Sequence, residues 1–218
     1  MRGTVQPVRR ASLTPVARDV LMADLEIPVV SLEDVYGGKL VAALDRQHPR
    51  DLFDVMQLFA HEGITPGIRR AFVVYLASSN RPIHEVLFTP LRDIRHDYEH
   101  NFEGMTTEHV PLDALLATRE RMVREIQQGL DDDERRFLLE ASCTALVAMS
   151  RWLAGQALPW QCSFSHAQPR YVEQYWVHLG ETVRFDAPLD LMRLPREYLH
   201  QPWPGAALTA GRAAQQQG

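Results

Sequence analysis

The segment Ser31-Leu-Glu-Asp-Val-Tyr-Gly-Gly-Lys-Leu-Val-Ala-Ala-Leu-Asp-Arg46, followed by Pro49-Arg-Asp-Leu-Phe-Asp54, predicts two consecutive helices. Ser31 can cap the first helix, because its hydroxyl can accept a hydrogen bond from a free backbone N–H group. Apolar residues then recur at helical spacing, and Pro49 should end this helix. The second helix is predicted at residues 50–61, with Gly63 suited to the left-handed conformation that ends many helices. The segment is therefore a helix-break-helix unit.

Helical patterns continue on the carboxyl side of this unit. Thr65 and Pro66 form a cap and first turn for a helix through residue 77, and Pro82 and Pro90 delimit two shorter segments. Two long amphipathic helices are predicted at 111–130 and from the acidic cap at 131–134 to about residue 154. Residues 3–8 and 27–30, on the amino side, are short and apolar enough for strands.

Composition changes near residue 141. All four tryptophans and both cysteines follow this point, and the first 140 residues contain neither type. Beyond it we predict strands at 161–165, 182–185 and 190–194, and a helix at 170–178 that stops at Gly180. We therefore expect a mainly α chain with a few short strands, divided into a helical domain (1–140), a small α+β domain (141–210) and a disordered tail (211–218).

Length and composition limit the possible functions. Two cysteines cannot form a disulfide framework, no signal peptide is recognisable, and the cytoplasm is the expected compartment. Uninterrupted apolar runs such as 71–77 are much shorter than the roughly 20 residues that cross a bilayer, so we expect no membrane partner. The formal net charge of −5 argues against a general nucleic-acid coat protein, although a local basic cleft remains compatible with it.

Lys39 is the single lysine among 23 basic residues; the other 22 are arginines. An ammonium is a compact, strongly hydrated point charge that the planar arginine fork does not copy. Lys39 is therefore a candidate phosphate contact. The alternative is that it is an ordinary solvated residue on the flank of a helix.

Around Lys39 the helix-break-helix unit carries the residue types that a nucleotide site needs. Lys39 supplies a point cation, Arg46 and Arg50 supply guanidinium groups that can grip phosphate, and Asp51 and Asp54 supply carboxylates. The alternative is structural: the two aspartates favour any helix N-terminus, and the two arginines could simply pair with them.

These residues carry a resemblance to a known family. Residues 30–46 with 49–54 resemble the Lys-Leu…Arg…Arg-Asp-x-x-Asp signature of the AbiEii nucleotidyltransferase toxins, and the similarity extends over about residues 1–140, including 101–106 and 133–139. The family belongs to type IV toxin–antitoxin and abortive-infection systems of phage defence. Its fold is related to polymerase-β-like nucleotidyltransferases, of which residues 1–140 would be the C-terminal helical half.

The resemblance implies roles for the five residues. Lys39 would contact the nucleoside triphosphate, with Arg46 and Arg50 beside it. Lys39 and the Asp51 carboxylate would be the catalytic residues, and Asp54 would be the structural neighbour of Asp51. The cofactors would be an NTP and Mg²⁺, the acceptor an RNA such as tRNA, and the protein partner a cognate antitoxin.

One part of the family pattern has no equivalent. The family's first motif is a Gly-Ser or Gly-Gly turn followed by metal-binding acids, but lysine follows Gly37-Gly38, and the acidic run 131–133 has no glycine turn. Without such acids, phosphoryl transfer lacks its main electrostatic support. We therefore expect a truncated toxin that keeps the NTP-binding half and is inactive by itself.

A second resemblance covers about residues 142–210. The segments Phe164-Ser-His-Ala-Gln-Pro169, Val183-Arg-Phe-Asp-Ala-Pro-Leu189 and Leu194-Pro-Arg-Glu-Tyr-Leu199 resemble the end of the ligand-sensing domain of AraC-type transcription regulators. The alternative is an unrelated α+β segment that packs on the preceding helices.

Two functional alternatives to a transferase remain. The chain could be a non-catalytic binding module that contacts an antitoxin or an intact toxin. It could also be a metal hydrolase, because His96 and His100 lie four residues apart on a predicted helix, a spacing at which both rings reach one metal. An active transferase would need metal-binding acids from elsewhere, such as Asp97, Glu99 or a second chain.

Overall fold

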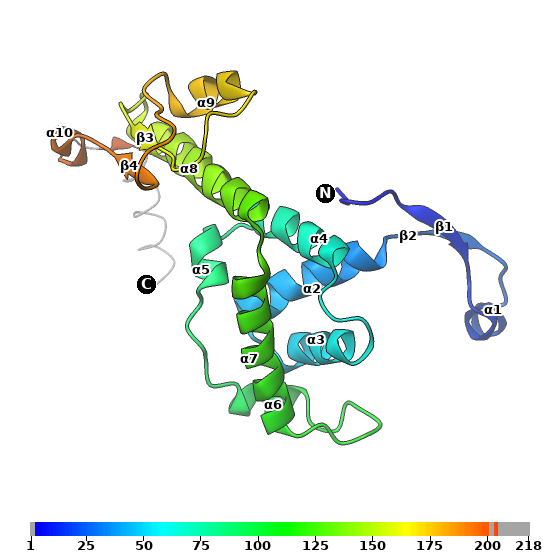
Figure 1. Cartoon of the computed structure of the whole chain (residues 1–218). Helices are drawn as coiled ribbons and strands as arrows, with labels where there is room; N and C mark the ends of the chain where they lie inside the picture. The colour runs from blue at the N-terminus through cyan, green and yellow to red at the C-terminus, as the bar shows by residue number, and fades with distance from the viewer. Residues whose placement is uncertain (1–2, 201–202, 205–218) are drawn as a thin grey trace. The chain divides into compact units, whose positions relative to one another are not determined.

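Helices form most of the part of the chain that the structure describes, which also contains four short strands (Figure 1). The computed structural model describes residues 3–200 and 203–204. These divide into two units, residues 1–138 and 139–218, which are described separately. The expectation of a mainly α protein with a few short strands is confirmed. The predicted disordered tail (211–218) falls outside the described residues.

Unit 1 contains a hairpin followed by a helical body. Its elements, in chain order, are β1 (Arg9–Ser12), α1 (Pro15–Leu21), β2 (Glu26–Val29), α2 (Leu32–Arg46), α3 (Pro49–His61), α4 (Pro66–Ala77), α5 (Ile83–Leu87), α6 (Arg95–Asn101) and α7 (Leu112–Gly129). Helix α8 (Asp132–Ala154) begins in unit 1 and continues into unit 2. Unit 2 then adds β3 (Gln161–Ser163), α9 (Val172–Leu179), β4 (Leu191–Arg193) and α10 (Arg196–Leu199).

The predicted caps of the central helices are present. The backbone N–H of Asp34 donates to Ser31 Oγ at 3.0 Å, and that of Ile68 donates to Thr65 Oγ1 at 3.3 Å. Helix α2 ends three residues before the predicted stop, because Gln47 takes the left-handed conformation (φ 52°). Pro49 is instead the first residue of α3, where its missing N–H group has no helical partner to lose.

Close packing of α2 against α4 forms the centre of the unit 1 core. A Cβ atom at Gly37 would lie 2.8 Å from both the Ala71 Cβ and the Phe72 backbone nitrogen, so only glycine allows this approach. Leu40, Leu44 and Phe72 are fully buried beside it. Helices α3 and α7 complete the core with Leu52, Val55, Leu58, Leu115, Met122 and Ile126.

The amino-terminal prediction was partly wrong. No strand covers residues 3–8; the strand is β1, and it pairs antiparallel with β2 across the unpredicted helix α1. The backbone N–H groups of Val5 and Gln6 donate to the Asp34 carboxylate at 2.7 and 3.0 Å instead of joining a sheet. The Asp34 side chain therefore takes the place of the neighbouring strand that residues 3–8 were expected to pair with.

Asp34 anchors this amino-terminal segment to the helical body. Its carboxylate also accepts hydrogen bonds from Tyr75 Oη (2.7 Å) and Ser31 Oγ (2.9 Å). Burial opposes ionisation, but the four hydrogen bonds prevail and hold the pKa of Asp34 below its ordinary value. Burial and the bond to Asp34 raise the pKa of Tyr75 to about 12.

Unit 2 packs one face of α8 against α9 and a small sheet. Strands β3 and β4 pair antiparallel, and Ser163 makes an isolated parallel bridge to Arg184. The predicted strand at 182–185 is thus reduced to this bridge, and that at 190–194 is shortened to β4. The core contains Cys143, Cys162, Phe164, Tyr175 and Leu179. Burial raises the pKa of the Cys143 thiol to about 11 and also raises that of Cys162.

Helix α8 differs from the expectation that no segment is long and apolar enough to cross a bilayer. By length and composition alone, this one helix among the described residues could span a bilayer. The sequence prediction considered uninterrupted apolar runs and missed it, because charged residues interrupt α8. Cys143 of this helix belongs to the unit 2 core, but only 17% of the apolar window of α8 is buried within the chain.

The contact at Gly37 generates a stability prediction. Gly37→Ala should lower the free energy of unfolding by about 1–3 kcal/mol, because the new methyl group collides with α4. Gly38→Ala is the matched control: its Cβ meets open space, so it should stabilise by about 0.5–1 kcal/mol. Urea denaturation measures both. Equal effects of the two substitutions would contradict the packing described.

Candidate nucleotide site

Two ion pairs join α2 to α3. Lys39 Nζ lies 2.5 Å from Asp54 Oδ2, and a terminal nitrogen of Arg46 lies 2.7 Å from Asp51 Oδ1. Lys39, the earlier cation in the chain, pairs with Asp54, the later carboxylate, and Arg46 pairs with Asp51. This order is the one expected for two antiparallel helices. The structure therefore brings together four of the five predicted site residues.

Helix geometry explains this convergence. Lys39 and Arg46 are seven residues apart, which places them about 10.5 Å apart along one face of α2. Asp51 and Asp54 are three residues apart and share the first turns of α3, about 4.5 Å along its axis. The two long basic side chains, two helical turns apart on α2, therefore reach onto a compact pair of acids on α3.

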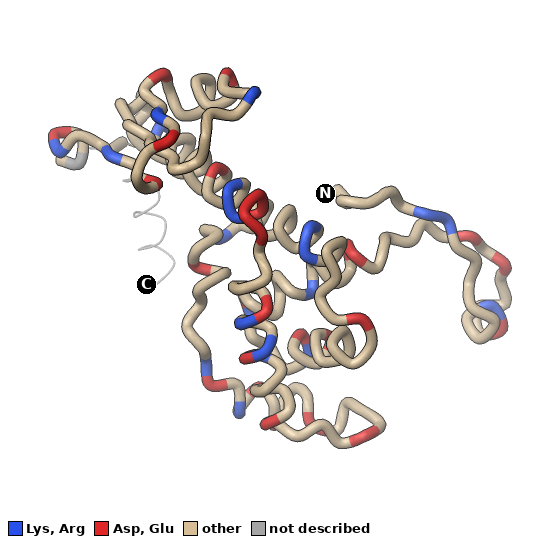
Figure 2. Tube along the Cα trace, in the orientation of Figure 1, with Lys and Arg blue, Asp and Glu red and all other residues tan. Residues whose placement is uncertain are grey.

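The two pairs differ in exposure. The Lys39 and Asp54 side chains are 41% and 35% exposed, whereas the Asp51 side chain is only 9% exposed beneath a largely exposed Arg46. Lys39 and Arg46 thus both present cationic groups to solvent. Figure 2 shows basic and acidic residues interspersed along the helices of this unit, so the positive charge here is local.

Arg50 occupies a different place from the other four residues. Its Nε donates to the backbone carbonyl of Asn101 at 3.1 Å, and its backbone N–H donates to His48 Nδ1 at 3.2 Å. The interpretation in which both arginines pair with the aspartates is therefore right for Arg46 and wrong for Arg50. Arg50 ties α3 to the end of α6.

Gln47 and Arg119 support the site and were not singled out in the sequence. Gln47 Nε2 donates to the Pro90 carbonyl at 2.8 Å, and its Oε1 accepts from Arg92 N (3.0 Å) and from Arg119 (3.1 Å). Arg119 also donates to the Arg92 carbonyl at 2.7 Å, while its Nε has no hydrogen-bond partner among the described residues. Burial lowers the pKa of this guanidinium.

A signal for this cluster did exist in the sequence. Helix α2 ends without a glycine or asparagine at the position where a left-handed residue is needed. A glutamine there takes an unfavourable conformation, and its buried amide compensates by holding the segment that contains Pro90 and Arg92.

The predicted histidine pair lies side by side on α6. The rings of His96 and His100 stack with centroids 4.2 Å apart on α6, and His100 Nδ1 bonds to the His96 carbonyl at 2.9 Å. Asp97 and Glu99 lie on the same short helix. Across residues 3–200 and 203–204, no group of three or more His, Cys, Asp or Glu side chains could hold a metal ion.

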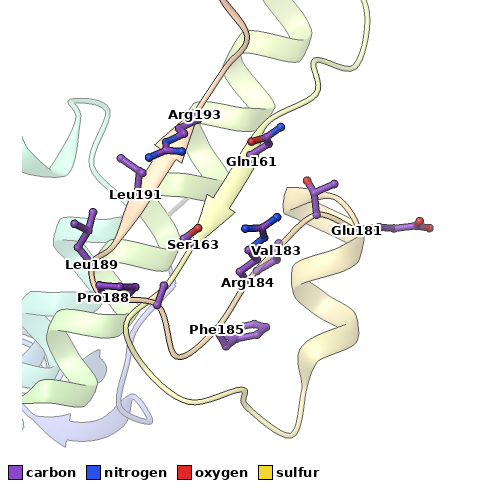
Figure 3. Close-up of a pocket in the computed structure, with 12 residues that line it drawn as sticks. Gln161, Ser163, Glu181, Val183, Arg184, Phe185, Pro188, Leu189, Leu191 and Arg193 are labelled. Atoms are coloured by element: carbon purple, nitrogen blue, oxygen red, sulfur yellow. The ribbon is translucent and has the colours of Figure 1, made fainter.

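A pocket of about 630 Å³ lies over the outer face of the unit 2 sheet (Figure 3). Its lining includes Gln161, Ser163, Arg184, Leu191 and Arg193, whose neighbours along the strands turn towards the core. Both arginines are exposed, and Glu181 also lines the pocket. The pocket belongs to unit 2, whereas the Lys39 site belongs to unit 1.

Comparison with protein families identifies the helical part of the chain. The family model described as the nucleotidyl transferase AbiEii toxin of type IV toxin–antitoxin systems matches residues 1–144, more than half of the chain. This chain belongs to the AbiEii family of nucleotidyltransferase toxins. The predicted resemblance is confirmed, and the α2–α3 ion pairs lie inside the AbiEii match.

A second family model overlaps the AbiEii match. The arabinose-binding domain of AraC transcription regulators matches residues 100–203, so the two matches share residues 100–144. This confirms the second resemblance, although the match begins well before the predicted residue 142. No curated protein and no solved structure gives a match.

The buried cluster in the AbiEii part predicts a coupled effect on stability. Gln47→Leu should lower the free energy of unfolding by about 2–3 kcal/mol, because Arg119 and the Arg92 N–H group lose their acceptor. Adding Arg119→Met should recover more than half of that loss, since no buried charge then lacks a partner. Denaturant titration of both single variants and the double variant measures the coupling. Simple additivity would contradict it.

Proposed function

We propose that this chain binds the triphosphate of a nucleotide at the exposed face of the α2–α3 ion pairs. The observation that carries the proposal is the position of Lys39: it is the single lysine of the chain, half-exposed, oriented by Asp54 and accompanied by Arg46. A phosphate that approaches this face meets two cations that are already held in place. Membership of a nucleotidyltransferase family supports the same function.

The pairing also explains how a nucleotide could displace the carboxylate. A half-exposed ion pair contributes only about 0–1 kcal/mol, because solvent screens it. A triphosphate carries several negative charges and forms charge-assisted hydrogen bonds, which are stronger than neutral ones. Exchange of Asp54 for phosphate at Lys39 therefore costs little, whereas the buried Asp51 stays behind Arg46.

The carboxylates do not fit a dedicated Mg²⁺ site. Asp51 and Asp54 each accept from a cation, and hard divalent ions prefer several free oxygen ligands. We propose that Mg²⁺ arrives with the nucleotide and that the chain by itself binds without transferring. The family implies an antitoxin as partner class, and we propose an RNA such as tRNA as the acceptor of a complete enzyme, in the cytoplasm.

Calorimetric titration with each of the four NTPs in the presence of Mg²⁺ tests the proposal. Lys39→Ala should weaken binding about 10–100-fold, because one charge-assisted contact to phosphate is worth about 1.5–3 kcal/mol. Arg46→Ala should weaken it in the same direction. Arg18→Ala, an exposed cation on α1, is the matched control and should leave the affinity unchanged.

Incubation with labelled NTP, Mg²⁺ and tRNA separates binding from turnover. The unmodified chain should label tRNA no more than the Lys39→Ala and Asp51→Ala variants do. Labelling that depends on Lys39 would overturn the proposal that the chain acts by binding alone. Binding that is unaffected by Lys39→Ala in a protein with normal circular dichroism would reject the site itself.

A further inference from the structure

The outer face of the unit 2 sheet carries a defined set of side chains. Alternate residues of a strand point to opposite faces of a sheet. Cys162 and Met192 pack in the core, so their neighbours along β3 and β4 point the other way. The outer face therefore consists of Gln161 and Ser163 on β3 and of Leu191 and Arg193 on β4. All four residues line the pocket of about 630 Å³.

Arg184 adds a second guanidinium to this face from a third segment of the chain. Ser163 bridges to Arg184 in parallel, and the neighbours of Arg184, Val183 and Phe185, pack against the core. Arg193 belongs to β4, on the other side of β3. The two arginines therefore flank β3 from opposite sides (Figure 3). Because adjacent strands are only about 4.8 Å apart, two extended arginine side chains can approach one group that lies over β3.

The charge of these two arginines is not balanced by the described part of the chain. Both are exposed, and neither guanidinium has an ion-pair or hydrogen-bond partner among residues 3–200 and 203–204. Asp190, which separates two lining residues in the sequence, accepts from the backbone N–H (2.7 Å) and the hydroxyl (3.1 Å) of Ser165. Glu181 is the single acid in the lining, so two arginines and one glutamate give it a formal charge of +1. One carboxylate would neutralise this charge.

An apolar wall borders the same pocket. Pro188, Leu189 and Leu191 lie together on the β4 side of the pocket (Figure 3). Leu189 is 56% exposed, so the hydrophobic effect would favour an apolar ligand group that covers it. The volume of the pocket lies within about 300–1,000 Å³, the usual range for small-molecule sites.

We propose that this pocket binds a small organic acid with one carboxylate and an apolar tail. The carboxylate would lie over β3, where Arg184 and Arg193 approach it from two sides and the Ser163 hydroxyl can donate to it. Guanidinium groups match carboxylates in both shape and charge. The tail would extend over Leu189 and Leu191. The pocket lies within unit 2, so the proposal does not depend on the triphosphate site proposed for unit 1.

The combination of charge and apolar wall disfavours other classes of ligand. A neutral sugar such as arabinose, which the matched family model names, would leave both guanidinium groups without a counter-charge. Inorganic phosphate would neutralise the arginines but would leave the apolar wall exposed. An uncharged apolar molecule would cover the wall but would leave the positive charge. A carboxylate with an apolar tail satisfies both parts of the lining.

Calorimetric titration of the full chain with octanoate tests the proposal. We expect octanoate to bind with a Kd below about 1 mM. Acetate, which lacks the tail, and octanamide, which lacks the charge, should each bind at least about 10-fold more weakly. Arg184→Gln and Arg193→Gln should each weaken octanoate binding about 10-fold, because each removes a charge-assisted hydrogen bond.

Arg170→Gln is the matched control, because Arg170 is an exposed arginine of the same unit that does not line the pocket. It should leave octanoate binding unchanged. Leu189→Ser should weaken the binding of octanoate and leave that of acetate unchanged. Added salt should weaken octanoate binding to the unmodified chain, because exposed charges are screened. This titration tests the charge without a substitution that could disturb folding.

Three results would overturn the proposal. The first is equal affinity for octanoate and octanamide, or octanoate binding that survives both arginine substitutions and added salt. The second is tighter binding of arabinose than of octanoate, which would assign the pocket to a neutral sugar. The third is the absence of octanoate binding at millimolar concentrations.

Discussion

The left-handed turn at Gln47 is the constraint on which the candidate site depends. This one residue reverses the chain between α2 and α3, and its buried amide is bonded on both sides, to the Pro90 carbonyl and to the Arg119 guanidinium. A turn of another shape would change the register of the two helices. Lys39 would then miss Asp54, and Arg46 would miss Asp51. The charged face therefore depends on a buried polar cluster behind it.

The site combines a rigid support with weak surface contacts. Gly37 allows α2 to pack on α4 without intervening side chains, and the resulting core holds Lys39 at a fixed position on the opposite flank. The ion pair at Lys39 is half-exposed and is therefore only weakly stabilising, so its cation is available to a more highly charged ligand. Stability and the proposed ligand recognition thus rest on different faces of the same helix.

Much of the helical body was predictable because its signals are local. Ser31, Thr65 and Pro66 mark helix starts, and apolar spacing identified the inward faces of α2, α3 and α7. Spacing also placed Lys39 and Arg46 on one flank. What escaped prediction depends on distant partners. Three such contacts join residues far apart in the sequence, and no periodicity encodes them. Asp34 accepts hydrogen bonds from the Val5 and Gln6 N–H groups, and Arg119 is buried beside Gln47. Arg50 donates to the Asn101 carbonyl and not to an aspartate. The strand at 182–185 failed for a related reason, since only Arg184 finds a bridge partner.

The single lysine permits a direct test of the central claim that Lys39 contacts the triphosphate. Reductive methylation with ¹³C-formaldehyde keeps its charge and adds one lysine methyl resonance, identified by its absence in Lys39→Arg. The account predicts that this resonance shifts on addition of ATP with Mg²⁺ and stays unchanged on addition of adenosine. A resonance that does not move while ATP binds elsewhere on the chain would contradict the account.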